Sequence, residues 1–320
     1  MSTQDNDLKP EEFGQAAIAV IADARERGFR EAAEVLAGAG LCGVCAAEDA
    51  GGLALGIGFA LPIVAQAGAQ RLQWPLLETM LIAKALGASP LAAELVAGTR
   101  VATWALQGDL KAGVAGHARH AAQCDWVLVA DGLGGAALLD VASVDVQEDG
   151  ALDPEHPQAW LDVGQAKVVA TLDAAAFATL QREGQILIAG CVNGAAEGAL
   201  NATADYMSTR VQFGRPLSAK QAVRHLLARM RLLQDTTHAG IERLLRSDEH
   251  GRERRVEPVL VNAIANAVFV LEKSLHLHGG MGFTWELPLH HALREVRKFD
   301  AAFGSGALAS QVGRDFIHSV

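Results

Sequence analysis

One short segment holds the residues best suited to bind an anion. It reads Arg210-Val211-Gln212-Phe213-Gly214-Arg215-Pro216-Leu217 and runs on to Gln221. A guanidinium presents a planar fork of N–H donors that matches phosphate oxygens. Arg210 is therefore a candidate phosphate-binding residue. The alternative is that Arg210 caps a helix and Phe213 is buried beside it.

A second candidate segment lies downstream and is rich in glycine. It reads His276-Leu277-His278-Gly279-Gly280-Met281-Gly282-Phe283-Thr284. Consecutive glycines let backbone N–H groups approach an anion without interference from Cβ atoms. A Gly-Gly pair after a helix is also a common C-cap, so Gly279 and Gly280 have a purely structural alternative. The histidines of this region lack the i, i+4 spacing of helical metal ligands, and we expect no metal site.

Three regions of different periodicity must position these segments. Residues 1–100 carry apolar side chains at helical spacing, and residues 101–172 hold short β-rich runs separated by turn residues. Helical periodicity returns over residues 173–320 in several long helices, which predicts a bundle. The predicted fold is therefore mainly α with a small central β domain.

The first long helix of the third region carries a face of small residues. Gly190, Gly194 and Gly198 recur every four residues within it. Residues four apart lie on the same face of a helix, and glycine lets two backbones approach closely. We expect another helix to pack tightly there.

Composition excludes several classes of protein. The chain has 320 residues, of which half are apolar, and a net charge of −10, so neither disorder nor nucleic-acid binding is expected. The polar, acidic start and the interrupted apolar runs argue against a leader and a membrane span, and we expect a cytoplasmic protein. Cys42 and Cys45 are spaced as C-x-x-C, but their Ala/Gly-rich surroundings favour small buried residues over a redox pair.

The R-x-Q-F-G-x-P-L segment, the later Gly-Gly loop and the order of the three regions together resemble the acyl-CoA dehydrogenase family. The resemblance implies a helical domain, a β domain and a C-terminal four-helix bundle. It also implies that FAD is the cofactor, with its adenosine and pyrophosphate bound by Arg210, Gln212, Phe213 and Gln221.

The resemblance assigns the Gly279-Gly280 loop to the same cofactor. Family members usually carry Gln three residues before these glycines, where this chain has His276, and an imidazole can still donate a hydrogen bond to a ribose or a phosphate. In the family this loop and the arginine reach across a dimer interface into a neighbouring subunit's flavin site. A homologous partner subunit is therefore implied.

The catalytic base of the family is missing from this chain. Dehydrogenation of an acyl thioester needs a carboxylate to take the α-proton while a hydride leaves Cβ. One family position for this Glu corresponds to Phe303, and the other, 26 residues before Arg210, corresponds to Gly184. Glu183 is adjacent to the second position, but one step along a helix turns a side chain by about 100°. Glu183 is the remaining candidate.

The segments that hold the flavin ring in the family are also reduced. Only Thr103 and Gly108 remain of its T-E-P-x-x-G-S-D segment, and no W-I-T-N counterpart is legible. We therefore expect one subunit of a FAD-dependent acyl-CoA dehydrogenase, in a heterotetramer of α2β2 type whose partner supplies the Glu. Electron-transfer flavoprotein as acceptor and acyl-CoA substrates of steroid side-chain catabolism are implied by resemblance.

Three alternatives remain open. The first is a homotetrameric acyl-CoA dehydrogenase with a relocated base, starting with Glu183. The second is a flavin-dependent monooxygenase on the same fold, which needs no base for an α-proton. The third is a scaffold subunit without catalytic activity that binds no flavin.

Overall fold

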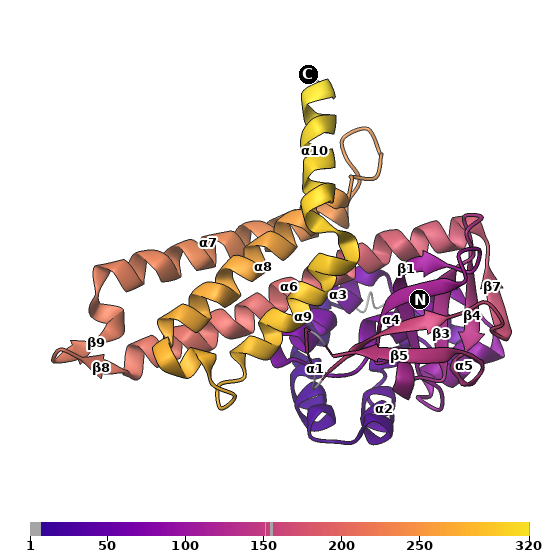
Figure 1. Ribbon diagram of the computed structural model, residues 1–320, viewed down its shortest axis with the longest axis horizontal. Helices are drawn as coiled ribbons and strands as arrows, with labels where there is room; N and C mark the ends of the chain where they lie inside the picture. Colours follow the sequence, from indigo (N-terminus) through magenta and orange to yellow (C-terminus); the bar gives the residue numbers. More distant parts are fainter. Residues whose placement is uncertain (1–7, 151, 154–155, 320) are drawn as a thin grey trace, which may run out of the picture.

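The computed structural model describes residues 8–150, 152–153 and 156–319. A helical N-terminal part is followed by a sheet and then by long helices, as Figure 1 shows. The N-terminal helices are α1 (Pro10–Arg25), α2 (Phe29–Gly38), α3 (Ile57–Gln70), α4 (Leu76–Ala85) and α5 (Pro90–Val96). The C-terminal helices are α6 (Ala174–Thr209), α7 (Gln221–Leu244), α8 (Glu257–Leu277), α9 (Leu289–Phe303) and α10 (Ser305–Ser319). The predicted fold class is confirmed.

A seven-stranded sheet lies between the two helical parts in the sequence. Its strands are β1 (Ala102–Asp109), β2 (Val114–Arg119), β3 (Trp126–Ala130), β4 (Ala136–Asp140), β5 (Asp145–Asp149), β6 (Gln158–Asp162) and β7 (Val168–Leu172). Their order in the sheet is β5-β6-β2-β1-β3-β4-β7, and β1 pairs with β3 in parallel while the other neighbours are antiparallel.

The central strands bury side chains on both faces of the sheet. In β3, Trp126 and Leu128 join the large core shared with the helices, while Val127 and Val129 join a smaller core on the opposite face. A strand buried on both faces has a continuous run of apolar residues, and for this reason β3 can be recognised from the sequence. The alanine-rich β4 and the polar β5 lack strong β-forming residues, and the sequence analysis did not resolve them.

Helix α6 packs against α3 through glycines, as its small-residue face predicts. A Cβ added at Gly194 would lie 2.0 Å from the carbonyl oxygen of Ala65, and one at Gly68 would lie 2.0 Å from that of Cys191. Because no Cβ is present at these points, the two backbones touch directly. This contact anchors α6, which at 36 residues is about 54 Å long and reaches from the sheet to the far end of the bundle (Figure 1).

Helix α8 is the central helix of the bundle. Pro258 lies in its first turn, and Gly279, with φ +62°, follows its end, as the sequence indicates. Among the described residues, it is also the one helix long and apolar enough to cross a membrane by length and composition. Half of its most apolar window is buried inside the protein. Packing between α6, α7 and α9 therefore accounts for its apolar composition.

We predict that Gly194→Ala lowers the free energy of unfolding by about 1–3 kcal/mol, because the added methyl group forces α6 away from α3. The matched control is Gly313→Ala in α10, where an added Cβ meets nothing within 4 Å. That change should raise stability by up to about 1 kcal/mol through helix propensity. Urea unfolding measures both, and equal effects would contradict the close packing of α3 and α6.

Candidate functional site

The two candidate segments lie at the same end of the bundle, beyond the C-terminus of α6. Tyr206, in the last turn of α6, stacks on His278 with ring centroids 4.5 Å apart. Its hydroxyl lies 3.9 Å from the Sδ atom of Met281, in the loop that follows α8. Packing of the α6 terminus on this loop therefore brings the Arg210 segment and the Gly279-Gly280 segment to one end of the molecule.

The segment after α6 is a tight hairpin. Strands β8 (Val211–Gln212) and β9 (Arg215–Pro216) pair antiparallel, and the two residues between them, Phe213 and Gly214, have φ of +55° and +74°. Two consecutive positive φ values are those of a type I′ turn, whose twist suits a two-residue hairpin. Phe213 is 87% exposed and its ring lies 4.3 Å from the Nζ atom of Lys220. The alternative of a buried Phe213 is therefore wrong.

The polar side chains of this hairpin point to solvent. Arg210, Gln212 and Gln221 are all exposed, and the Arg210 guanidinium has no ion-pair partner among the described residues. An arginine without a carboxylate keeps its N–H donors available for an anion. The hairpin and the start of α7 thus present a set of donors that this chain does not itself satisfy.

The glycine loop is equally open. A Cβ added at Gly279 or Gly280 would meet nothing within 4 Å, so a ligand or another chain can approach the backbone closely there. His276 is exposed on the last turn of α8, whereas His278 is buried with its Nδ1 atom 2.8 Å from the Ser274 carbonyl oxygen. His276 is therefore available to a ligand, and His278 has a structural role.

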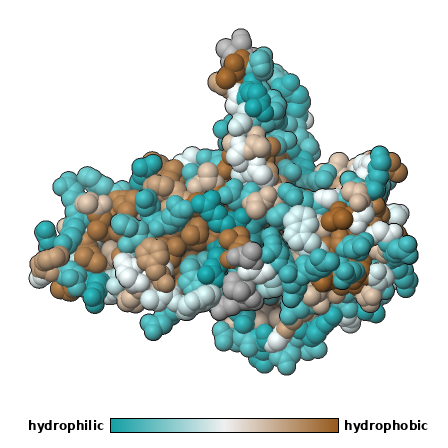
Figure 2. All heavy atoms as spheres, viewed as in Figure 1, coloured by the Kyte–Doolittle hydropathy of each residue, from teal (hydrophilic) through white to brown (hydrophobic). Residues whose placement is uncertain are grey.

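These residues do not enclose a site within the chain. We call Arg210, Gln212, Gln221 and the pair Gly279-Gly280 the bundle-tip residues. Large apolar side chains lie exposed around them, namely Val211, Phe213, Met281, Phe283 and Trp285. Apolar atoms are visible at this end of the bundle in Figure 2. A cationic, donor-rich patch with an apolar surround suits one side of a phosphate-bearing ligand.

The two family positions for a catalytic base both adjoin β1. A Cβ added at Gly184 would lie 2.6 Å from Cζ3 of Trp104 in β1, so an indole ring fills the space that a longer side chain would take. Phe303 ends α9, and the Nε2 atom of Gln107 in β1 donates to the carbonyl oxygen of the preceding Ala302 at 2.7 Å. Strand β1 therefore lies against both positions, and neither position carries a carboxylate.

The candidate base Glu183 is engaged in an ion pair. Its carboxylate contacts the ammonium group of Lys84 in α4, and its side chain is 17% exposed. Glu197, deeper in α6, lies 3.8 Å from Arg231, in agreement with a salt-bridged surface residue. The structure thus gives Glu183 a structural partner and leaves its catalytic role a prediction.

A buried ion network joins all three parts of the chain, and the sequence analysis missed it. Arg119 in β2 contacts Glu78 in α4, with Nε 2.9 Å from Oε1, and also the carboxylate of Glu295 in α9. Lys298 lies 2.9 Å from Glu295 and 3.4 Å from Asp153. These partners are far apart in the sequence, and only the i, i+3 spacing of Glu295 and Lys298 gives a local signal.

The network shifts the pKa values of its members. Burial raises the pKa of Glu295, but Arg119 and Lys298 outweigh burial and hold the pKa well below its ordinary value. Burial lowers the pKa of Arg119, and the carboxylates of Glu78 and Glu295 raise it further than burial lowers it. Both groups are therefore charged at neutral pH, and each depends on the other for compensation.

The remaining reactive side chains have structural surroundings. Burial raises the pKa of the Cys42 thiol to about 12 and that of Cys45 to about 11, so neither is a nucleophile or a redox-active thiolate at neutral pH. Arg297 pairs with Glu272 and Asp300, at 2.9 and 2.8 Å. Within the described ranges, no group of histidine, cysteine or carboxylate side chains could hold a metal ion.

The chain is similar in sequence to known proteins. Residues 175–315 match the model of the acyl-CoA dehydrogenase C-terminal domain. The chain is 28% identical over 318 residues to the acyl-CoA dehydrogenase FadE34 of Mycobacterium tuberculosis, a match covering 91% of this chain and 44% of the relative. It is 30% identical over 106 residues to an acryloyl-CoA reductase (NADH) of Anaerotignum propionicum, covering 32% of this chain and 27% of that protein. This chain thus spans less than half the length of both relatives.

Solved structures share the fold over nearly the whole chain. A chain of the Tcur3481-Tcur3483 steroid ACAD G363A variant has a TM-score of 0.83 at 23% identity, covering 97% of this chain and 98% of that one. A chain of the ChsE4-ChsE5 complex from Mycobacterium tuberculosis has a TM-score of 0.81 at 20% identity, covering 99% and 98%. At these identities the likeness concerns the fold.

We predict that Glu295→Gln lowers the free energy of unfolding at neutral pH by about 3–5 kcal/mol, because it leaves Arg119 and Lys298 undercompensated in the interior. The matched control is Glu272→Gln, whose exposed pair with Arg297 should be worth less than about 1 kcal/mol. Chemical unfolding of the two variants measures the difference.

The ion pairs of Glu295 with Arg119 and Lys298 also predict how the stability of the protein responds to acid. The folded pKa of Glu295 is below its unfolded value of about 4.3, so its contribution is complete above that value and is lost as the pH falls through the folded pKa. Below about pH 5 the melting temperature should fall, and less steeply in Glu295→Gln. Identical pH profiles for the variant and the unchanged protein would contradict this role.

Proposed function

Because this chain belongs to the acyl-CoA dehydrogenase family, we propose that it is one subunit of a FAD-dependent enzyme that dehydrogenates an acyl-CoA thioester between Cα and Cβ. In this proposal the chain pairs with a homologous subunit in a cytoplasmic α2β2 heterotetramer. The partner holds the flavin ring and supplies the catalytic Glu, while this chain binds the ADP portion of the partner's FAD.

The observation that carries this proposal is the contrast between an open tip and a closed interior. The bundle-tip residues are exposed, and the space beside Gly279 and Gly280 is open, as a shared cofactor site requires. In the interior, the Trp104 ring of β1 fills the space beside Gly184 of α6, and Gln107 of β1 is bonded to Ala302 of α9. The residues therefore fit the phosphate end of FAD and do not fit its ring within the same chain.

The bundle-tip residues act by binding and orientation. The Arg210 guanidinium compensates negative charge on a pyrophosphate, and the Gln212 and Gln221 amides add hydrogen bonds that fix its position. Backbone N–H groups at Gly279-Gly280 are accessible because no Cβ shields them. FAD supplies the acceptor for the hydride that leaves Cβ. This chain presents Phe303 and Gly184 where an acid–base group would stand, so it takes no part in the proton transfer.

Exposed apolar surfaces support assembly with a partner. Phe283 is 78% exposed and Trp285 is 56% exposed beside the tip. Helix α10 projects from the body (Figure 1), and its residues Phe316 and Ile317 are 70% and 71% exposed. Such surfaces are costly in a lone soluble subunit and are typical of interfaces. They support assembly of this chain with another subunit.

The substrate class rests on similarity alone. The structures with the same fold include a steroid ACAD, Tcur3481-Tcur3483, and the ChsE4-ChsE5 complex. On that basis we propose an acyl-CoA of steroid side-chain degradation as substrate. We also propose that an electron-transfer flavoprotein reoxidises the enzyme. A solved structure with the same fold, described as the electron transferring flavoprotein of Acidaminococcus fermentans, supports this proposal.

We predict that Arg210→Ala, in the complex co-expressed with the partner subunit, weakens FAD binding by about 10- to 100-fold, because a charge-assisted hydrogen bond to phosphate is lost. The complex itself should remain assembled on gel filtration. Arg243→Ala, an exposed arginine of α7 without an ion-pair partner among the described residues, is the matched control and should leave flavin content unchanged. Full flavin occupancy in Arg210→Ala would support the scaffold alternative.

Glu183→Gln tests the relocated-base alternative. We predict that this change leaves the turnover of the complex within about twofold, because the carboxylate is already paired with Lys84. Steady-state kinetics with an acyl-CoA and an artificial electron acceptor provide the measurement. A loss beyond about 100-fold, with flavin content intact, would assign the base to Glu183 instead of the partner.

A further inference from the structure

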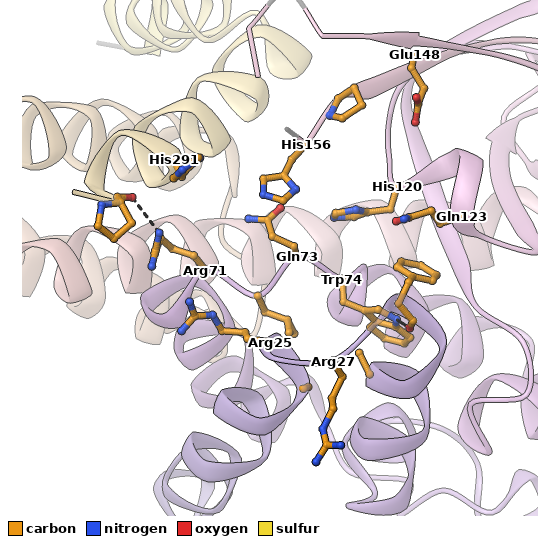
Figure 3. A pocket seen from close by; sticks show the side chains of 16 residues that line it. Arg25, Arg27, Arg71, Gln73, Trp74, His120, Gln123, Glu148, His156 and His291 are labelled. Atoms are coloured by element: carbon orange, nitrogen blue, oxygen red, sulfur yellow. Dashed lines mark hydrogen bonds between the residues drawn. The ribbon is translucent and has the colours of Figure 1, made fainter. Parts of the chain in front are cut away.

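A large cavity lies where the N-terminal helices, the sheet and the start of α9 meet (Figure 3). Its volume is about 720 Å³, within the range of small-molecule sites. The polar side chains that line it are those of Arg25, Arg27, Arg71, Gln73, His120, Gln123, Glu148, His156 and His291. None of the bundle-tip residues is among them.

The charges lining this cavity are unbalanced. Three arginines face one acidic side chain, Glu148. Arg27 is compensated by Asp23, 2.9 Å away, but no described carboxylate lies within ion-pair distance of Arg25 or Arg71. A cavity with two uncompensated guanidinium groups has a positive potential, which favours an anion.

Arg71 is held in position by the backbone. It follows α3 with φ +58°, a left-handed conformation that turns the chain toward α4. Its Nη1 atom donates to the carbonyl oxygen of Pro288, at the start of α9, at 3.0 Å, as drawn in Figure 3. Burial and the neighbouring Arg25 lower the pKa of Arg71, so both disfavour its charge. An anion bound beside Arg71 would stabilise its positive charge. The guanidinium N–H groups that do not donate to Pro288 are available to such an anion.

The other side of the cavity is neutral and polar. Burial, and next the charge of Arg119, lowers the pKa of His120 to about 3, so this imidazole is neutral at physiological pH. Gln73 and Gln123 contribute amides, and His156 lies next to Gln73 in Figure 3. The Oε1 atom of Gln73 is buried and has no hydrogen-bond partner among the residues that the structure describes. These groups can hydrogen-bond the uncharged part of a ligand whose anionic groups contact the arginines.

We propose that this cavity binds a small organic anion with at least two phosphate or carboxylate groups, contacted by Arg25 and Arg71. Both groups match the planar fork of a guanidinium. The ligand would contact α1, the α3–α4 connection and the α9 start together. Binding therefore stabilises the junction of the N-terminal helices with the bundle, and the melting temperature rises with ligand concentration.

Titration calorimetry and thermal unfolding with inorganic pyrophosphate and with citrate test this proposal. At least one probe should bind, and Arg25→Gln and Arg71→Gln should each weaken binding by roughly tenfold. Arg25 is exposed and makes no structural hydrogen bond among the described residues, so its variant keeps the fold if Arg71→Gln does not. Arg243→Gln is the matched control and should bind as the unchanged protein does.

The outcomes distinguish a phosphate ligand from a carboxylate ligand, and the cavity from the proposed flavin site. Binding of pyrophosphate alone identifies an organic phosphate, and binding of citrate alone identifies a polycarboxylate. Binding that persists in Arg210→Ala but weakens in Arg25→Gln locates the ligand in this cavity, independently of the proposed flavin site. Absence of binding by both probes, or equal binding by Arg25→Gln and Arg243→Gln, would overturn the proposal.

Discussion

The arrangement of the three parts of this chain depends on one buried cation. Arg119 extends from β2 between Glu78 of α4 and Glu295 of α9, and Lys298 continues the network to Asp153. Charges in the interior are tolerated only when they compensate one another, so the network fixes how α4, the sheet and α9 meet. That junction sets how α9 lies against β1, where Gln107 donates to the carbonyl oxygen of Ala302.

The sequence predicts the features of this protein that are local. The alternation of helical and β-rich regions, the glycine face of α6 and the absence of Glu at Phe303 and Gly184 are each visible within a few turns of chain. The domain limits of residues 1–100, 101–172 and 173–320 remain predictions, although α5 ends at Val96 and β7 ends at Leu172. The cofactor roles of the bundle-tip residues also remain predictions.

Features that depend on distant residues were not accessible from the sequence. Glu78 and Glu295 are both partners of Arg119, and nothing in the sequence connects them. The basic cavity combines Arg25 with Arg71 and with α9, which periodicity cannot place together. Weak β-forming residues hid β4 and β5, whose pairing is set by their neighbours in the sheet. The indole ring of Trp104 beside the base position at Gly184 became apparent only from the structure.

The central claim is that this chain completes a flavin site belonging to another subunit, and a visible absorption spectrum tests it most directly. The spectrum should be recorded for the chain purified alone and for the chain co-expressed with its partner subunit. The account predicts flavin bands only in the co-expressed complex, because the tip is open and the interior is closed. Flavin bound stoichiometrically by the lone chain, with activity on an acyl-CoA, would contradict it.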